Sequence, residues 1–206
     1  MKLVIIDYGI GNTKSLINAF DKIDLCGSIT LSDDEEIINN SDLIIIPGVG
    51  AFEKAMNELK KRDLVRIIRN YAESNKPIVG ICLGMQLLFE SSEEFGLNQG
   101  IGLIKGSVVR FPETITDKIP HVSWNKLKLH KKESLLFEGI NKNEYYYFVH
   151  SFICKPANKS EILTTSNYGG VEFCSSVKKN NIYGFQFHPE KSSKSVSYTH
   201  LTLPTN

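Results

Sequence analysis

The clearest chemical pattern in the sequence is the segment Gly80-Ile81-Cys82-Leu83-Gly84. An apolar run precedes the cysteine, and a glycine lies two positions away on each side. This pattern is typical of a nucleophile elbow, a sharp strand-to-helix turn that exposes one reactive side chain. The glycines are needed because the strand and the helix approach each other closely. We therefore predict that Cys82 is a nucleophile; the alternative is an inert cysteine buried in the core.

A second pattern is the segment Phe185-Gln186-Phe187-His188-Pro189-Glu190. Pro189 favours extended backbone at His188, and residues two positions apart in an extended chain lie on the same side. Glu190 would then orient the imidazole of His188, which gives the nucleophile, base and orienting carboxylate of acyl transfer. On its own the segment is more typical of a surface turn with a solvated histidine. Its combination with an elbow cysteine favours the catalytic interpretation.

The loop Pro47-Gly48-Val49-Gly50 directly follows an apolar run at residues 43–46. Glycines let backbone amides come close to a ligand, so this loop and the amide of Leu83 are predicted to donate hydrogen bonds to an oxyanion. An ordinary turn between a strand and a helix is the alternative. Gly9-Ile10-Gly11 does not continue into a dinucleotide-binding motif, and no phosphate-binding P-loop motif occurs.

The elements that must position these residues alternate between strands and helices in the first half of the chain. Short runs rich in β-branched residues indicate strands buried on both faces. Strands are expected at residues 3–6, 26–31, 43–46 and 77–81, and helices at 12–23, 33–39, 52–61, 63–74 and from 85 to about 90. This alternation predicts an α/β fold with a mostly parallel, doubly wound sheet.

After about Gly100 the pattern changes to shorter, often alternating strands. They are expected at residues 104–111, 125–129, 145–153, 161–165, 171–177 and 181–187. No Pro/Gly/Ser-rich linker separates the two halves, so the second half is predicted to be an antiparallel β extension of the same domain. A length of 206 residues also favours one domain.

Composition excludes several classes of function. With 24 Lys+Arg against 23 Asp+Glu, the formal net charge of +1 gives no broad basic field for nucleic acid. Cys26, Cys82, Cys154 and Cys174 lack the spacing of a zinc site or a disulfide framework. No apolar run reaches the length of a membrane span or resembles a signal peptide. We expect a cytoplasmic protein without metal or cofactor that binds neither nucleic acid nor membrane.

Together, the G-x-C-x-G elbow, the upstream P-G-x-G loop and the downstream H-P-E segment resemble the class I, or triad, glutamine amidotransferases. Within that class the chain is similar to the glutaminase subunits of imidazole glycerol phosphate synthase. The motifs that carry this similarity lie at residues 7–12, 82–88, 121–125 and 147–152. The resemblance covers residues 1–194 and implies one glutamine amidotransferase domain with a flavodoxin-like core. One departure is Ser123, where the family usually has glycine.

The resemblance implies roles for individual residues. Cys82 would attack the side-chain carboxamide of glutamine, His188 would transfer protons and Glu190 would orient His188. Residues implied to bind the substrate or its oxyanion are Gly48, Val49, Gly50, Leu83, Gln86, Glu94, Ser151 and Phe152.

The resemblance also implies a partner. Ammonia would pass to a separate (βα)₈-barrel cyclase subunit of a heterodimer, which forms imidazole glycerol phosphate for histidine biosynthesis together with an aminoimidazole carboxamide ribotide. Asn12, His121, Trp124 and Asn125 are expected at the interface, with Trp124 as an aromatic anchor.

The last residues do not follow the family pattern. The resemblance implies an amphipathic helix after the H-P-E-K-S segment, but the apolar residues of 192–206 do not recur at helical spacing. We expect residues 195–206 to be an atypical tail that is not native family sequence; a divergent, disordered tail is the alternative.

Three other functions remain open from the sequence. The first is an amidotransferase subunit of another synthase, against which the motifs at 7–12 and 121–125 argue. The second is a catalytically inactive interaction module, against which the joint presence of Cys82, His188 and Glu190 argues. The third is a cysteine peptidase, and no segment of the sequence is typical of peptide binding.

Overall fold

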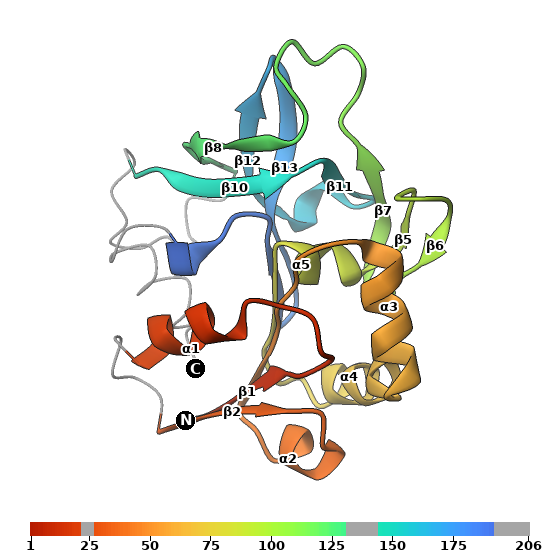
Figure 1. Ribbon diagram of the computed structural model, residues 1–206, viewed down its shortest axis with the longest axis vertical. Helices are drawn as coiled ribbons and strands as arrows, with labels where there is room; N and C mark the ends of the chain where they lie inside the picture. The colour runs from red at the N-terminus through yellow and green to blue at the C-terminus, as the bar shows by residue number, and fades with distance from the viewer. Residues whose placement is uncertain (22–26, 131–143, 192–206) are drawn as a thin grey trace.

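The computed structural model describes residues 1–21, 27–130 and 144–191, and a twisted sheet forms its centre (Figure 1). Within these ranges, five strands pair in parallel in the order β2, β1, β3, β4 and β14. Their bounds are Lys2–Ile6 (β1), Ser28–Ser32 (β2), Leu43–Ile46 (β3), Ile78–Ile81 (β4) and Ile182–Phe185 (β14). The predicted parallel α/β core is confirmed. The predicted tail at 195–206 and Cys26 lie outside the described residues.

Helices cover both faces of the parallel strands. In Figure 1, α1 lies on one side of the sheet, whereas α3 and α4 lie on the other. The helices are α1 (Thr13–Asp21), α2 (Glu35–Asn39), α3 (Phe52–Lys61), α4 (Leu64–Glu73) and α5 (Leu83–Leu87). Of the helices in the part of the chain described here, none is long and apolar enough to cross a membrane.

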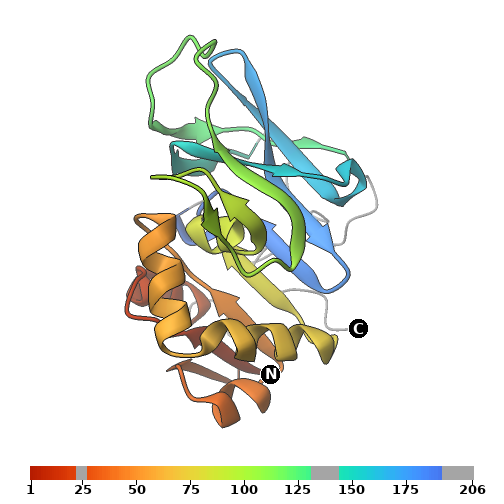
Figure 2. The same cartoon turned by 90° about the vertical axis from the view of Figure 1, so that its right-hand side faces the viewer.

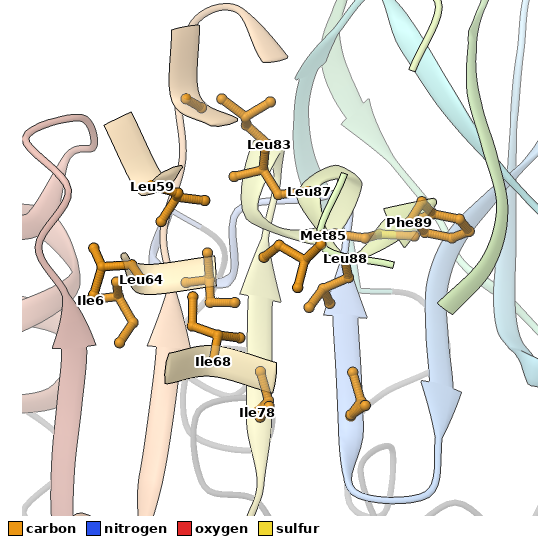
Figure 3. Packing of buried hydrophobic residues seen from close by; sticks show 14 of the residues in the cluster. Ile6, Leu59, Leu64, Ile68, Ile78, Leu83, Met85, Leu87, Leu88 and Phe89 are labelled. Carbon is orange, nitrogen blue, oxygen red and sulfur yellow. The ribbon is translucent and has the colours of Figure 1, made fainter. Parts of the chain in front are cut away.

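Strands β1, β3, β4 and β14 are almost continuous apolar runs because both of their faces are buried, whereas the edge strand β2 is mostly exposed. On β3, Ile44 and Ile46 belong to the core under α3 and α4, whereas Leu43 and Ile45 belong to the core under α1. Alternate residues of a strand point to opposite faces, so each helical layer covers its own set. Figure 3 shows part of the first core, with side chains from α3, α4 and α5 over two strands: Leu59, Leu64, Ile68, Leu83, Met85 and Leu87 with Ile6 and Ile78.

Beyond β14 the same sheet continues as the antiparallel extension expected from the sequence, except that β5 pairs with β7 in parallel (Figure 2). It runs from β14 through β13, β11, β7 and β5 to β6, and β12 pairs with both β13 and β9. Their bounds are Phe89–Ser92 (β5), Asn98–Gln99 (β6), Ile104–Arg110 (β7), Lys128–Leu129 (β9), Phe152–Pro156 (β11), Ile162–Tyr168 (β12) and Val171–Lys179 (β13).

A separate antiparallel pair consists of β8 (His121–Asn125) and β10 (Tyr146–His150). This pair contacts the short 3₁₀ helix η3 (Pro189–Lys191), which follows β14. It therefore brings residues from the middle of the chain next to the H-P-E segment.

Several predicted elements end a few residues from their observed bounds, and three differ in kind. The helix expected from 85 to about 90 ends at Leu87, because residues 89–92 pair with β7 as strand β5. The strand expected at 145–153 is two strands in different sheets, β10 and β11. The strand expected at 125–129 divides into the end of β8 and β9. In each case the pairing of distant strands decides the boundary, and a local apolar run does not report it.

Candidate active site

Cys82 lies at the turn between β4 and α5, with a backbone φ of 54° and ψ of −111°. A positive φ is a strained conformation for a residue that has a side chain. The amide of Cys82 donates a hydrogen bond to the carbonyl of Phe185 at 2.7 Å, which extends the pairing of β4 with β14 up to the turn. Cys82 is buried, at 7% exposure, and packs in the core under α1, but it also lines a pocket through which a ligand could reach it.

The glycines on either side of Cys82 occupy positions where no side chain fits. A Cβ at Gly80 would lie 2.5 Å from the carbonyl oxygen of Gly84, and a Cβ at Gly84 would lie 1.8 Å from the carbonyl oxygen of Ile46. Both distances are far below van der Waals contact. The helix after the cysteine therefore starts in direct contact with the ends of β3 and β4.

The loop after β3 packs against this turn. A Cβ at Gly48 would lie 2.7 Å from Cβ of Leu83, so Gly48 allows the loop to approach the start of α5. Gly50 has a φ of 89°, which favours glycine. Val49 and Gly50 line the pocket together with Leu83, whereas Gly48 contacts Leu83 without lining it. The loop and the elbow are thus adjacent, as an oxyanion site requires.

Tyr8, which was not predicted as a site residue, anchors the loop through a hydrogen bond. Its hydroxyl donates a short hydrogen bond to the carbonyl of Pro47, and its side chain is fully buried. Burial, with a smaller contribution from Cys82, raises the pKa of Tyr8 far above its usual value, so the hydroxyl stays a donor. Tyr8 lies within the motif at residues 7–12, and that motif is the feature of the sequence that could have predicted its role.

His188 and Glu190 form a buried pair. Nδ1 of His188 lies 2.8 Å from Oε1 of Glu190, and the two side chains are 6% and 3% exposed. Glu190 lies in the 3₁₀ helix η3, so it reaches the imidazole through a tight turn and not through the extended backbone expected from the sequence. The amide of His188 donates to the carbonyl of Tyr147 at 2.9 Å, which ties this segment to β10. The alternative of a solvated surface histidine does not fit this burial.

The charge state of His188 is set by its neighbours. Burial opposes a positive charge, but hydrogen bonds and charge interactions with Cys82 and Glu190 outweigh it and raise the pKa of His188 to about 10. The imidazolium is therefore the favoured form at neutral pH. A protonated imidazole beside a cysteine can give a proton to a leaving group.

Cys82 and His188 face a pocket of about 320 Å³. The pocket also contains seven of the residues predicted to bind substrate: Val49, Gly50, Leu83, Gln86, Glu94, Ser151 and Phe152. Gly48 and Glu190 do not line the pocket, but they contact Leu83 and His188, which do. Pro120, Val149 and His150 also line it and were not predicted.

Two glutamines connect the pocket wall to the cysteine. Nε2 of Gln86 donates to the carbonyl of Phe152 at 3.2 Å and to Oε1 of Gln186 at 3.1 Å. Nε2 of Gln186, which is fully buried, lies 3.9 Å from Sγ of Cys82. Since both amide hydrogens of Gln86 are used, its Oε1 is the atom that it can offer to a ligand, as an acceptor. Gln186 lies two residues before the H-P-E segment, and nothing in the local sequence predicted its contact with Gln86.

Glu94 is held by the start of α3. Its Oε2 accepts a hydrogen bond from the amide of Phe52 at 2.7 Å, and the N-cap residue Ala51 supplies no side-chain hydrogen bond of its own. The carboxylate therefore caps α3 from a distant loop. A carboxylate accepts several hydrogen bonds, so Glu94 can also receive a cationic ligand from the pocket.

The four residues predicted at a partner interface are in different environments. Asn12 is exposed, and Trp124 is 49% exposed. His121, in contrast, is fully buried in this chain, and its place at an interface stays a prediction. Asn125 is half-buried and directs Nδ2 toward Nε2 of His121 at 3.1 Å. The alternation along β8 explains this, because His121 and Asn125 point inward and Trp124 points outward.

Comparison with known proteins agrees with this geometry. Residues 4–202 match the family described as Glutamine amidotransferase class-I. The HisH subunit of imidazole glycerol phosphate synthase from Aquifex aeolicus is 44% identical over 194 residues, which cover 94% of this chain and 91% of the relative. The corresponding subunit from Sulfurimonas denitrificans is 47% identical over 196 residues, with coverage of 92% and 91%. The family match extends on both sides of residue 194, and the domain boundary there stays a prediction.

Solved structures show the same fold. PurLQS from Thermotoga maritima has a TM-score of 0.72 at 20% identity, with 97% of each chain covered. The glutaminase domain of Trypanosoma brucei CTPS with bound acivicin has a TM-score of 0.66 at 15% identity, with 98% of this chain and 92% of that chain covered. The predicted fold is thus confirmed, and the curated relatives identify the family more closely. The chain belongs to the class I glutamine amidotransferases and, among them, to the HisH family of imidazole glycerol phosphate synthase subunits.

Proposed function

We propose that this chain is the glutaminase subunit of an imidazole glycerol phosphate synthase, which hydrolyses glutamine to glutamate and ammonia and delivers the ammonia to a cyclase subunit. The HisH relatives support the assignment to this synthase over another one. The observation that carries the chemistry is the strained turn at Cys82, which opens into the same pocket as the buried pair of His188 and Glu190.

In the first half of the proposed reaction, the Cys82 thiolate attacks the carboxamide carbon of glutamine and forms a C–S bond. Backbone amides of Val49, Gly50 and Leu83 are the proposed donors to the oxygen, which becomes negative. His188 gives its proton to the leaving nitrogen, the C–N bond breaks, and ammonia departs from a thioester.

In the second half, water hydrolyses the thioester. His188, now neutral, takes a proton from the water while its oxygen attacks the carbonyl carbon. The C–S bond breaks, glutamate leaves as its side-chain carboxylic acid, which then loses its proton to solvent, and the Cys82 thiolate and the His188 imidazolium are restored. Glu190 holds Nδ1 of His188 throughout and keeps the ring oriented.

The far end of the pocket suits the amino-acid end of glutamine. The carboxylate of Glu94 and Oε1 of Gln86 are acceptors, which an α-ammonium group requires. The backbone of Ser151 and Phe152 lines the same wall. This arrangement would select an amino acid over a simple amide.

We propose that the cyclase docks on the outer face of β8 and β10. This face carries Val122, Trp124, Tyr147 and Val149, and Val122 and Trp124 are each about half exposed. On β8, apolar side chains thus point outward and polar ones inward, the reverse of the usual pattern of a strand with one solvated face. Exposed apolar patches mark interaction sites. Val149 also lines the pocket, so the proposed interface adjoins the site where ammonia forms.

Reaction with a diazo-oxo-norleucine, an electrophile shaped like glutamine, tests the chemistry. We expect one adduct per chain on Cys82, identified by peptide mass spectrometry, with protection by glutamine. The Cys82→Ala variant should not be labelled, and an unchanged yield in that variant would refute the assignment. A channelling assay with a cyclase subunit and its nucleotide tests the partner, because glutamine should then support ring formation without free ammonia.

A further inference from the structure

Two buried histidines, His121 on β8 and His150 on β10, form a hydrogen bond beside the pocket. Nδ1 of His121 lies 3.0 Å from Nε2 of His150, and Nδ1 of His150 lies 2.8 Å from the carbonyl oxygen of Phe152. A carbonyl oxygen only accepts, so His150 carries its proton on Nδ1 and offers Nε2 as an acceptor. His121 must then donate through its own Nδ1.

The far nitrogen of His121 faces two donors. Nε2 lies 3.1 Å from Nδ2 of Asn125 and 2.9 Å from Oγ of Ser123. The amide and the hydroxyl can both donate, so Nε2 accepts. Every ring nitrogen of the pair has a partner while both rings are neutral. The hydroxyl of Ser123 adds a second donor to this nitrogen.

Aromatic rings enclose the pair. The ring of His121 stacks on Tyr168 at 3.9 Å and on Phe148 at 5.1 Å between centroids. Phe173 packs against both imidazoles, at 5.6 Å from His121 and 5.0 Å from His150. The rings are therefore fixed in place in a largely apolar setting.

This setting keeps both histidines neutral at pH 7. Burial lowers the pKa of His121 to about 4, against a smaller opposing effect of Asp117. Burial, followed by the nearby His121, lowers the pKa of His150 to about 3; the carbonyl of Phe152 opposes this shift and His188 adds to it. The tautomers required by the hydrogen bonds and the charge state thus agree.

At the pocket, the carbonyl of Phe152 accepts two hydrogen bonds. One comes from Nδ1 of His150 and the other from Nε2 of Gln86, at 2.8 and 3.2 Å. His150 and Phe152 flank Ser151, so the first bond closes a tight turn within this wall of the pocket. The orientation of the Gln86 amide depends on where that carbonyl points.

We propose that His121 and His150 are positioning residues, which fix the Phe152 carbonyl and through it Gln86 for recognition of the amino-acid end of glutamine. The proposal rests on the proposed glutaminase function. His121 acts only through His150, and His150 acts through a backbone carbonyl and takes no part in proton transfer.

Two substitutions of His150 separate its two hydrogen bonds. His150→Asn places an amide nitrogen near the position of Nδ1 and can still donate to Phe152, but it offers no acceptor to His121. His150→Gln places its amide near the position of Nε2 and can accept from His121, but it has no donor for Phe152. The proposal requires the asparagine variant to retain glutamine recognition better than the glutamine variant.

The experiment compares two reagents on the full chain. A diazo-oxo-norleucine needs recognition of its amino-acid end, whereas iodoacetamide reacts with the thiol alone, so the ratio of the two rate constants at Cys82 measures recognition. We expect this ratio to fall about tenfold in His150→Gln, the effect of one lost hydrogen bond to a polar group, and less than about threefold in His150→Asn. A ratio that stays unchanged in His150→Gln, or falls equally in both variants, would overturn the proposal.

Further variants keep the test decisive. His121→Phe removes the donor to His150 and keeps a flat ring, and it should lower the ratio by about threefold even where His150→Gln folds poorly. Ser123→Gly leaves Asn125 as a donor to His121, so its ratio should stay within about twofold. A tenfold fall in Ser123→Gly would contradict the route through His150. If iodoacetamide labels Cys82 of the unchanged chain and the glutamine analogue does not, the proposed function fails and the inference fails with it.

Discussion

His188 and His150 line the same pocket, yet their surroundings give them opposite charge states. Both are buried, and burial alone would make both neutral. His188 contacts Cys82 and Glu190, and its pKa is raised to about 10. His150 contacts a backbone carbonyl and the neutral His121, and its pKa is lowered to about 3. The identity of the polar partner, more than the degree of burial, therefore decides what a histidine can do here.

The two histidines also differ in what surrounds their partners. The partner of His188 is a carboxylate on a short turn at the end of the parallel sheet, and a charged ring there can exchange a proton. The partners of His150 belong to two strand ends packed among aromatic rings, and a neutral ring there can only hold a fixed geometry. One pocket thus combines a proton-transfer residue with a rigid donor of the same type.

The largest test of this comparison is His188→Gln. Glutamine keeps a polar side chain but has no titratable proton, so glutaminase turnover should fall by about 10³-fold, measured as ammonia release in the presence of the cyclase. His150→Gln should mainly raise the KM for glutamine. A similar fall in kcat for the two variants would remove the distinction between them.

A smaller effect is expected for Glu190→Gln. This change removes the carboxylate that contacts Nδ1 of His188, so the pKa of His188 should fall, as followed by NMR titration of its imidazole protons. Turnover should fall by about 10- to 100-fold because the ring loses its orienting carboxylate. The titrations of His121 and His150 serve as the internal control. A pKa of His188 that does not move would contradict the role given to Glu190.

The last prediction concerns the free energy of unfolding as a function of pH. The change has opposite signs for the pair His121 and His150 and for His188. The lowered pKa values of His121 and His150 give stability that is present above pH 6.5 and is lost as the pH falls toward 4 and 3. The raised pKa of His188 gives stability that is present below pH 6.5 and is lost as the pH rises toward 10. At pH 5 the acid loss should be about 2 kcal/mol for each lowered histidine.

Urea unfolding at pH 5, 7 and 9 measures both effects. His150→Asn should show a flatter acid side than the unchanged chain, and His188→Gln should show a flatter alkaline side. If both variants flatten the same side, the opposite charge states are wrong.

Residues adjacent in sequence were easier to predict than contacts between distant strands. The elbow, the glycine loop and the parallel strands follow from local runs, because a strand buried on both faces must be apolar throughout. The division of residues 145–153 into two strands depends on pairing with β8 and β7, which lie far away in the sequence. The hydrogen bond between Gln186 and Gln86 also could not be predicted, because the two residues are 100 positions apart in the sequence.

The environment of His121 could not be predicted for a related reason. Its motif indicated a partner surface, and Trp124 and Val122 do lie on the outer face of β8. The polar residues of this strand point inward, where His121 forms a hydrogen bond with His150 of β10. The alternation of side chains along a strand shows which residues share a face, but it does not show which of the two faces is buried.

The close contact between Gly84 and the carbonyl of Ile46 has a consequence for engineering. Ile46 is the last residue of β3, and the glycine loop begins at the next residue. The cysteine turn and the oxyanion loop are therefore parts of one interlocked block, and neither can be lengthened, shortened or redesigned alone. Attempts to alter the reaction of this chain should vary the opposite wall at residues 149–152 and leave the block intact.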